Sequence, residues 1–160
     1  MDPISVTKVD HIHRYVTDKF EAAKWYERLL GFQVVGELHA NKYPKAPLDI
    51  ANADVSVKFA LFSTGDPAQM GSTATIALRV APDDFVRLVD NAADLGIVKR
   101  DNAPLTREDI VRHTGIGDQS VYIVDPWGNS IEIIAEMNEA TIARLGSGHG
   151  LYSDQTEAAS

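Results

Sequence analysis

The sequence predicts an α+β domain built from two copies of a βαβββ module, which form a curved mixed sheet around a cup-shaped site. Three observations predict this fold. Strand-like and helix-like segments recur in the same order in the two halves, each half has a helix that ends in Leu-Gly followed by an apolar residue, and the chain closes with a hairpin. Module one is expected at about residues 6–63 and module two at about 73–136. Both belong to one domain over 1–146, followed by a flexible tail at 147–160.

The first module is expected to open with a strand over Val6–Val16 and to continue with a helix. Thr17-Asp18 are good capping residues, and the apolar residues that follow recur at helical spacing as far as Leu30. Gly31 suits the left-handed position that ends a helix.

Three further strands complete the first module. The segment Phe32–Leu38 is predicted to be a strand. Ile50 and Val55–Phe62 are predicted to form a hairpin that turns at Asn52-Ala53-Asp54.

The second module repeats this order. Thr73–Val80 is predicted to be a strand, and Pro82 opens a helix whose apolar stripe runs to Leu95, with Gly96 as its end. Ile97–Lys99 is expected to be a short strand.

The end of the second module contains the clearest turn signal. Arg100–Gln119 is a long polar connection, expected to be a lid or a site loop. Ser120–Val124 and Ser130–Ile134 are predicted to form a hairpin around Asp125–Asn129, which has the residues of a tight turn. Ala140–Leu145 is expected to add a short helix.

Composition excludes several classes of function. The chain has 160 residues, of which 44% are hydrophobic, and it carries a formal net charge of −8 with scattered Lys and Arg. A nucleic-acid or membrane-surface partner requires a basic patch, so neither is expected. No apolar run approaches the roughly 20 residues of a membrane span. The absence of cysteine excludes disulfides and thiolate metal sites, and these features together favour the cytoplasm.

Several motifs resemble those of a known superfamily, the vicinal oxygen chelate proteins. The resemblance extends over about Val6 to Glu136 and rests on four strings: Val9–Asp18, Trp25-Tyr26, Leu30-Gly31-Phe32 and Val121–Glu132. The superfamily includes glyoxalases, fosfomycin-resistance and bleomycin-resistance proteins, and extradiol dioxygenases. The resemblance implies that this chain has the doubled module, binds a small molecule and forms a homodimer.

The resemblance also implies a metal site in the cup. His11 and Glu132 occupy the positions of two metal ligands, and a neutral imidazole with a carboxylate suits a divalent ion such as Fe, Mn, Ni or Zn. The third position, His or Gln in the superfamily, is Thr75 here, and a neutral hydroxyl is a poor ligand. The extra carboxylate of glyoxalases is replaced by Val57 and Lys58.

Two further histidines are candidate catalytic residues. His13 shares a strand face with His11 because side chains alternate, so it is also expected to point into the cup, whereas Arg14 is expected on the helix side. The segment Arg112-His113-Thr114 resembles the part of extradiol dioxygenases that presents a histidine to the bound catechol, where His113 would bind a substrate oxygen or move a proton. The competing interpretation of this segment is an exposed polar loop.

A small-molecule cavity is the last expected feature. Four side chains are candidates to line it: Tyr15, Phe59, Thr75 and Tyr122. The contrasting interpretation for His11 and Glu132 is a hydrogen-bonded pair across the sheet, with no metal.

Three classes of function follow from these residues. The first is a metal-dependent enzyme on a small oxygen-rich or aromatic molecule, with the His113 segment favouring an extradiol-type oxidoreductase over a glyoxalase-type lyase or isomerase. The second is a metal-free binding protein of the bleomycin-resistance type, which Thr75 favours. The third is a metal-independent enzyme that uses His11 or His13 as a base and Glu132 as the group that orients it.

Overall fold

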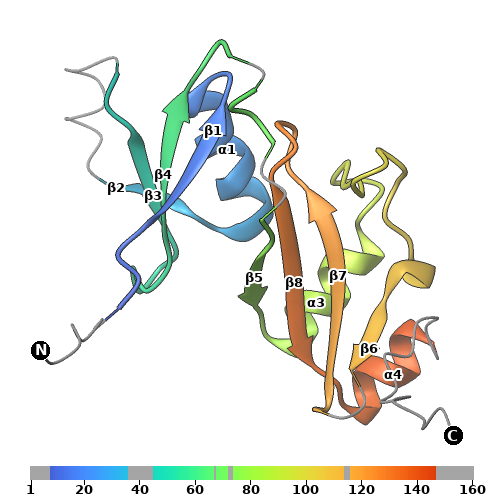
Figure 1. Cartoon of the computed structure of the whole chain (residues 1–160). Helices are drawn as coiled ribbons and strands as arrows, with labels where there is room; N and C mark the ends of the chain where they lie inside the picture. Colours follow the sequence, from blue (N-terminus) through green and yellow to red (C-terminus); the bar gives the residue numbers. More distant parts are fainter. Residues whose placement is uncertain (1–7, 36–44, 67, 72–73, 114–115, 147–160) are drawn as a thin grey trace, which may run out of the picture. The chain divides into compact units, whose positions relative to one another are not determined.

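The structure is a computed structural model that describes residues 8–35, 45–66, 68–71, 74–113 and 116–146 (Figure 1). It comprises two compact units, unit 1 over Met1–Gly71 and unit 2 over Ser72–Ser160. Each unit has its own four-stranded mixed sheet, and with the helices they give the predicted α+β class. Within the described residues, no helix is long and apolar enough to cross a membrane.

The described residues of unit 1 form four strands and one helix. The strands are β1 (Ile12–Val16), β2 (Gln33–Val35), β3 (Leu48–Ala51) and β4 (Lys58–Ser63), and the helix is α1 (Lys19–Leu30). The strand order is β1-β4-β3-β2, in which β1 runs parallel to β4 and the other pairs are antiparallel. The hairpin predicted around Asn52 is therefore present between β3 and β4, although β4 begins at Lys58 rather than at Val55.

Local sequence sets both ends of α1. The carboxylate of Asp18 accepts hydrogen bonds from the backbone N–H groups of Phe20 and Glu21, which otherwise lack intrahelical partners. Gly31 ends the helix with a φ of 68°, a left-handed conformation that glycine adopts without steric cost. Both capping predictions are confirmed.

The core of unit 1 lies between α1 and the sheet. Phe59 is fully buried, with its ring stacked on Phe32 and edge-on to Tyr26. The Arg14 guanidinium lies 5.2 Å from the centre of the Phe59 ring, on the helix side as predicted. Burial of Phe59 in this core does not fit its expected place in a ligand cavity.

In the part of unit 2 that the structure describes, there are four strands and two α-helices. They are β5 (Ile76–Arg79), β6 (Val111–His113), β7 (Asp118–Val124), β8 (Ser130–Glu136), α3 (Pro82–Asp90) and α4 (Glu139–Leu145). The order β5-β8-β7-β6, with β5 parallel to β8, repeats the order of unit 1 and confirms the doubled module.

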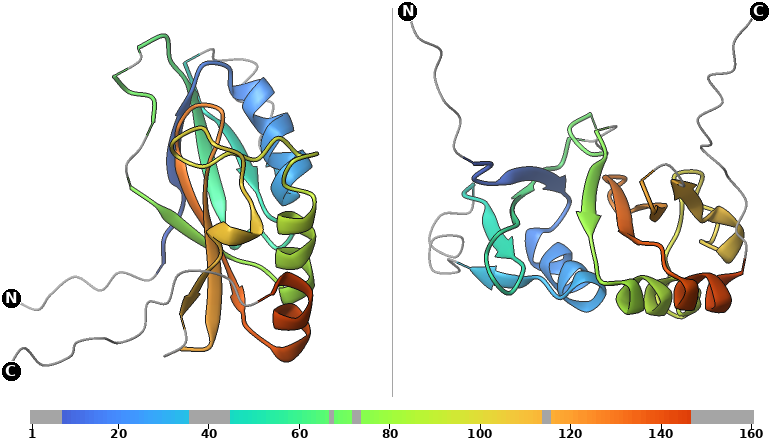
Figure 2. Two further views of the ribbon diagram at one scale, coloured as in Figure 1. Left: turned by 90° about the vertical axis from the view of Figure 1, so that its right-hand side faces the viewer. Right: turned by 90° about the horizontal axis from the view of Figure 1, so that it is seen from below.

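Side chains on β8 alternate between the two faces of the unit 2 sheet. On β8, Ile131, Ile133 and Ala135 are fully buried on the face that α3 contacts, and α4 lies beside α3 (Figure 2). The residues between them, including Glu132, point to the opposite face, which we call the open face of unit 2. The open face of unit 1 is defined in the same way, as the face of its sheet opposite α1.

Three predictions for unit 2 need correction. The helix that opens at Pro82 ends at Asp90, and the residues up to Gly96 form turns instead of helix. Arg100–Gln119 is not a single loop, because it contains a 3-10 turn at Arg107–Asp109 and the whole of β6, and β7 already begins at Asp118. Of the predicted strand Ile97–Lys99, only Val98 pairs, in isolated bridges to Pro104 and Val124.

Candidate functional site

The two histidines at the start of the first module converge on the open face of unit 1. The Nε2 atoms of His11 and His13 are 3.1 Å apart, whereas the centres of the two rings are 5.1 Å apart. The rings therefore approach each other through their Nε2 ends. This pairing follows from strand alternation, which places residues two apart on the same face.

An acidic neighbour orients His11. The Nδ1 atom of His11 is 2.7 Å from the Asp10 carboxylate, and Lys58 lies 3.2 Å from the same oxygen. The hydrogen bond from His11, followed by the Lys58 ammonium, lowers the pKa of Asp10 below its ordinary value. A neutral imidazole carries one ring proton, so donation of Nδ1–H to this carboxylate leaves Nε2 of His11 with its lone pair.

Aromatic side chains continue this face beyond the histidines. The centre of the Phe62 ring lies 4.7 Å from that of the His13 ring. It also lies 5.7 Å from the centre of the Tyr15 ring, which stacks on Phe62. Tyr15, expected to line a cavity, thus lies two residues from His13 on the same face of β1. Together these side chains form a surface that is apolar apart from the imidazole nitrogens and the Tyr15 hydroxyl.

A second polar group lies on the open face of unit 2. The Nε2 atom of His113 is 3.0 Å from the Ser120 hydroxyl and 3.8 Å from a carboxylate oxygen of Glu132. His113 ends β6 and Glu132 lies at the middle of β8, so the intervening strand β7 supplies the serine. The alternative in which His113 sits in an exposed polar loop does not hold, because it belongs to a strand and is largely buried.

An ion pair borders this group. Arg79 donates two hydrogen bonds to the carboxylate of Asp118, at 2.6 and 3.0 Å. These bonds lower the pKa of Asp118, and the nearby His113 contributes in the same direction. The unit 2 face therefore holds a connected set of charged and polar side chains around Glu132.

Thr75, at the position of the missing third ligand, has a structural partner. Its hydroxyl oxygen is 2.9 Å from that of Ser130, which is 7% exposed at the start of β8. The hydrogen bond joins the residue just before β5 to the first residue of β8. Thr75 thus has an interaction that requires no metal.

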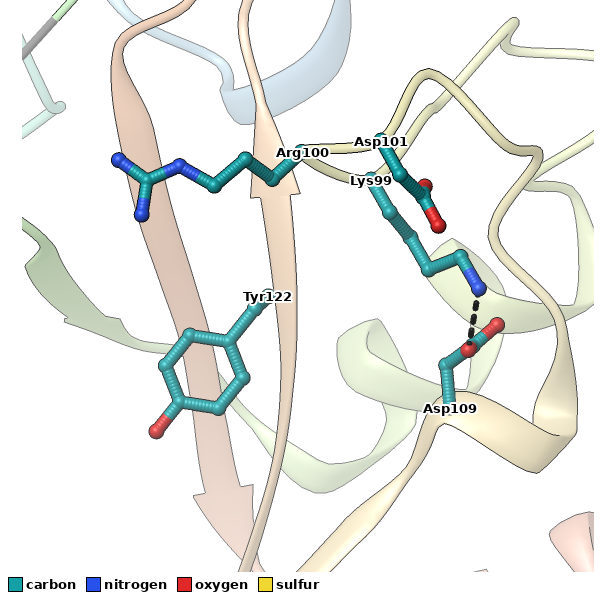
Figure 3. A pocket seen from close by; sticks show the side chains of 5 residues that line it. All are labelled: Lys99, Arg100, Asp101, Asp109 and Tyr122. Atoms are coloured by element: carbon teal, nitrogen blue, oxygen red, sulfur yellow. Dashed lines mark hydrogen bonds and ion pairs between the residues drawn. The ribbon is translucent and has the colours of Figure 1, made fainter. Parts of the chain in front are cut away.

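A cavity of about 520 Å³, wide open to solvent, lies beside Tyr122. Figure 3 shows its five lining residues, which all belong to unit 2: Lys99, Arg100, Asp101, Asp109 and Tyr122. Lys99 and Asp109 form an ion pair at 2.7 Å on one side, while the Arg100 and Tyr122 side chains extend together toward β8. Tyr122 is the direct cross-strand neighbour of Glu132, so the cavity adjoins the polar group described above.

A divalent metal ion requires several nitrogen or oxygen donor atoms that lie close together. Among the residues that the structure describes, no three or more His, Asp or Glu side chains are grouped to hold an ion. The pair of imidazoles in unit 1 nevertheless provides two nitrogen donors, one of them with its lone pair fixed by Asp10. The predicted ligands His11 and Glu132 belong to different units.

Residues 8–133 match the Glyoxalase/Bleomycin resistance protein/Dioxygenase superfamily. The chain belongs to this superfamily. The match covers most of the chain and includes both modules, so the resemblance inferred from the motifs is confirmed.

Solved structures of superfamily proteins share the fold. A glyoxalase/dioxygenase from Nostoc punctiforme is 22% identical, with a TM-score of 0.60 over 86% of this chain and 100% of its own. The fosfomycin resistance protein FosX from Listeria monocytogenes, solved with Mn(II) and sulfate, is 16% identical, with a TM-score of 0.60 over 88% and 98%. The bleomycin resistance determinant of transposon Tn5 is 23% identical, with a TM-score of 0.52 over 83% and 99%. The comparison with curated proteins gives no match.

Of the partner residues in these groups, the sequence offers a signal for Asp10 but not for Ser120, Arg79 or Arg100. Asp10 adjoins His11, and an acidic residue beside a candidate ligand could have indicated its role in orienting the imidazole. Arg79 lies on β5, whose partner β8 is far along the chain, and Ser120 lies on β7. Only strand pairing brings these two residues to Asp118 and His113, respectively. Arg100 likewise reaches the cavity through the fold of a loop.

Proposed function

We propose that this superfamily member is an enzyme that acts on a small oxygen-rich or aromatic molecule and uses a divalent metal, in the manner of an extradiol dioxygenase. The observation that carries the proposal is the contact of His113 with Ser120 and Glu132 beside a cavity of about 520 Å³. An imidazole near a carboxylate at a ligand cavity is suited to proton transfer. FosX shows that a member of the superfamily binds Mn(II).

The roles of the chain's own residues follow from their chemistry. His11 and Glu132 are the predicted metal ligands. The divalent ion of this proposal would polarise substrate oxygens and stabilise negative charge on them. His113 would move a proton at a substrate oxygen, with its Nε2 atom held by the Ser120 hydroxyl 3.0 Å away.

The cavity favours a planar ligand that carries a negative charge or several oxygens. Tyr122 is 42% exposed, and its phenol ring offers a stacking surface. Arg100 extends in the same direction and offers a fork of N–H donors to carboxylate or phenolate oxygens. These two side chains match the oxygen-rich aromatic class.

The first test is elemental analysis of protein purified without a chelator. We expect near-stoichiometric Fe, Mn, Ni or Zn in the wild type and a loss of this metal in Glu132→Ala. Glu136→Ala, which removes an exposed carboxylate from the same strand, is the matched control and should retain the metal. Absence of metal under every loading condition would exclude the metal-dependent enzyme.

The second test measures oxygen uptake with a panel of catechols. Turnover by the metal-loaded wild type, abolished in His113→Ala and retained in the surface variant Arg87→Gln, would support the dioxygenase. Product formation without oxygen uptake would indicate a glyoxalase-type lyase or isomerase instead.

A second candidate function is metal-free binding of a drug or metabolite, as in the bleomycin-resistance members. The hydrogen bond between Thr75 and Ser130 favours it, because the third ligand position is committed to a structural contact. Ligand binding in the cavity without metal and without turnover would support this candidate. A metal-free turnover abolished by His11→Ala would instead support the third class.

We also propose that the protein is a cytoplasmic homodimer. The lack of cysteine supports a reducing compartment, and dimers are the commonest closed assemblies of soluble chains. Light scattering of the purified chain tests the dimer, and a mass equal to one chain would contradict it.

A further inference from the structure

We infer that His13 is a metal ligand paired with His11, so that unit 1 holds a divalent ion between two imidazole nitrogens. This inference rests on the metal use proposed above and changes the role of His13 from a catalytic base to a ligand. Both donors of this pair come from unit 1, so the pair requires no ligand at Thr75.

The first argument is the separation of the donor atoms. Metal–imidazole bonds are about 2.0–2.1 Å long, so two nitrogens bound at right angles lie roughly 3 Å apart. The Nε2 atoms of His11 and His13 are 3.1 Å apart. Their positions already match two adjacent ligands of one ion.

The second argument is the proton on His11. Asp10 accepts the Nδ1–H hydrogen bond at 2.7 Å, and a carboxylate in this place behind a histidine fixes the ring and raises the basicity of the other nitrogen. Lys58 lies 3.2 Å from the same carboxylate and stabilises its charge. Nε2 of His11 is consequently an electron-pair donor aimed at its neighbour.

The third argument is access. The side chain of His11 is 39% exposed, and His13 is also exposed, so an ion can reach both nitrogens without rearrangement of the core. On the other side, Phe62 packs against His13 at 4.7 Å and limits the movement of its ring. The alternative arrangement is a simple hydrogen bond between the two rings, which needs no metal.

The test uses Cu(II) as a probe on the full chain stripped of metal. Electron spin-echo spectroscopy counts the imidazoles bound to Cu(II) through their remote nitrogens. We expect two imidazoles in the wild type and one in His13→Ala or His11→Ala. Tyr15→Phe, the next change along the same face, should keep two.

Affinity for Zn(II), measured by competition with a chelating dye, gives a second readout. We expect His13→Ala to weaken binding by more than about 100-fold and Asp10→Asn to weaken it about 10–100-fold, the loss typical of removing an orienting partner. One imidazole in the wild type, or a Zn(II) affinity unchanged in His13→Ala, would overturn the inference. The wild-type count decides the matter even where a variant fails to fold.

The two proposals fail in different ways. A single coordinated imidazole in a protein that still binds metal through Glu132 and turns over a catechol would refute the histidine pair and leave the proposed enzyme intact. Two coordinated imidazoles without any turnover would refute the enzyme and leave the pair.

Discussion

The substitution Thr75→Val tests whether the third ligand position has a structural role. It keeps the branched shape of the side chain and removes the hydroxyl that lies 2.9 Å from the Ser130 oxygen. A net intramolecular hydrogen bond contributes about 0.5–1.5 kcal/mol. Because Thr75 is exposed and water replaces part of the lost bond, we expect a loss of about 0.5–1 kcal/mol in the free energy of unfolding. For a unit of this size, that corresponds to a fall in melting temperature of about 2–8 °C.

Urea denaturation followed by circular dichroism, on Thr75→Val, Ser130→Ala and the double variant, isolates the pair. The double variant should lose less stability than the sum of the two single variants, because the second change removes a partner that is already gone. The affinity of Thr75→Val for Zn(II) should stay within about twofold of the wild type. A lost metal ligand would weaken it at least about tenfold, which corresponds to about 1.4 kcal/mol of binding free energy. Additive losses, or a tenfold weaker affinity for Zn(II), would refute the structural role.

Three further changes have defined outcomes. His113→Gln should lower kcat about 10²–10⁴-fold, the usual contribution of a general acid or base, and should leave ligand affinity largely unchanged; equal kcat would contradict a proton-transfer role. In Asp118→Asn, the loss of the Arg79 ion pair should lower the melting temperature near neutral pH. The folded pKa of Asp118 lies below its ordinary value of 3.8, so the ion pair stabilises the fold above that value and this stabilisation disappears as pH falls through the folded pKa. The melting temperatures of the wild type and Asp118→Asn should therefore converge in acid, and a difference that stays constant with pH would contradict this. Phe59→Ala should cost about 3–5 kcal/mol in urea denaturation because the ring is fully buried, whereas a loss below 1 kcal/mol would place Phe59 outside the core.

Local chemistry made much of the fold predictable from the sequence. The capping residues of α1 and the hairpin between β7 and β8 depend on neighbouring residues, and both were predicted correctly. The end of α3 was predicted five residues too late because the apolar spacing continues through turns up to Leu95. The strand β6 was missed because it has only three residues and its side chains are mostly polar.

The candidate site was less predictable than the fold. Alternation along one strand correctly grouped His11 with His13, since both belong to a continuous segment. The contact of His113 with Glu132 depends on the pairing of three strands, which spacing alone does not determine. Phe59 was assigned to the cavity on its aromatic character, but the register of β4 turns it toward α1.

The turn after β7 determines which chemical groups the sheet of unit 2 presents to a ligand. The buried carboxylate of Asp125 accepts hydrogen bonds from the backbone N–H groups of Trp127 and Asn129 and from the Asn129 amide, which fixes the length of the connection. A slip of one residue would bury Glu132 and expose Ile131 and its neighbours. The Asp125 carboxylate, although it does not face the candidate site, therefore fixes the register that keeps Glu132 on the open face of unit 2.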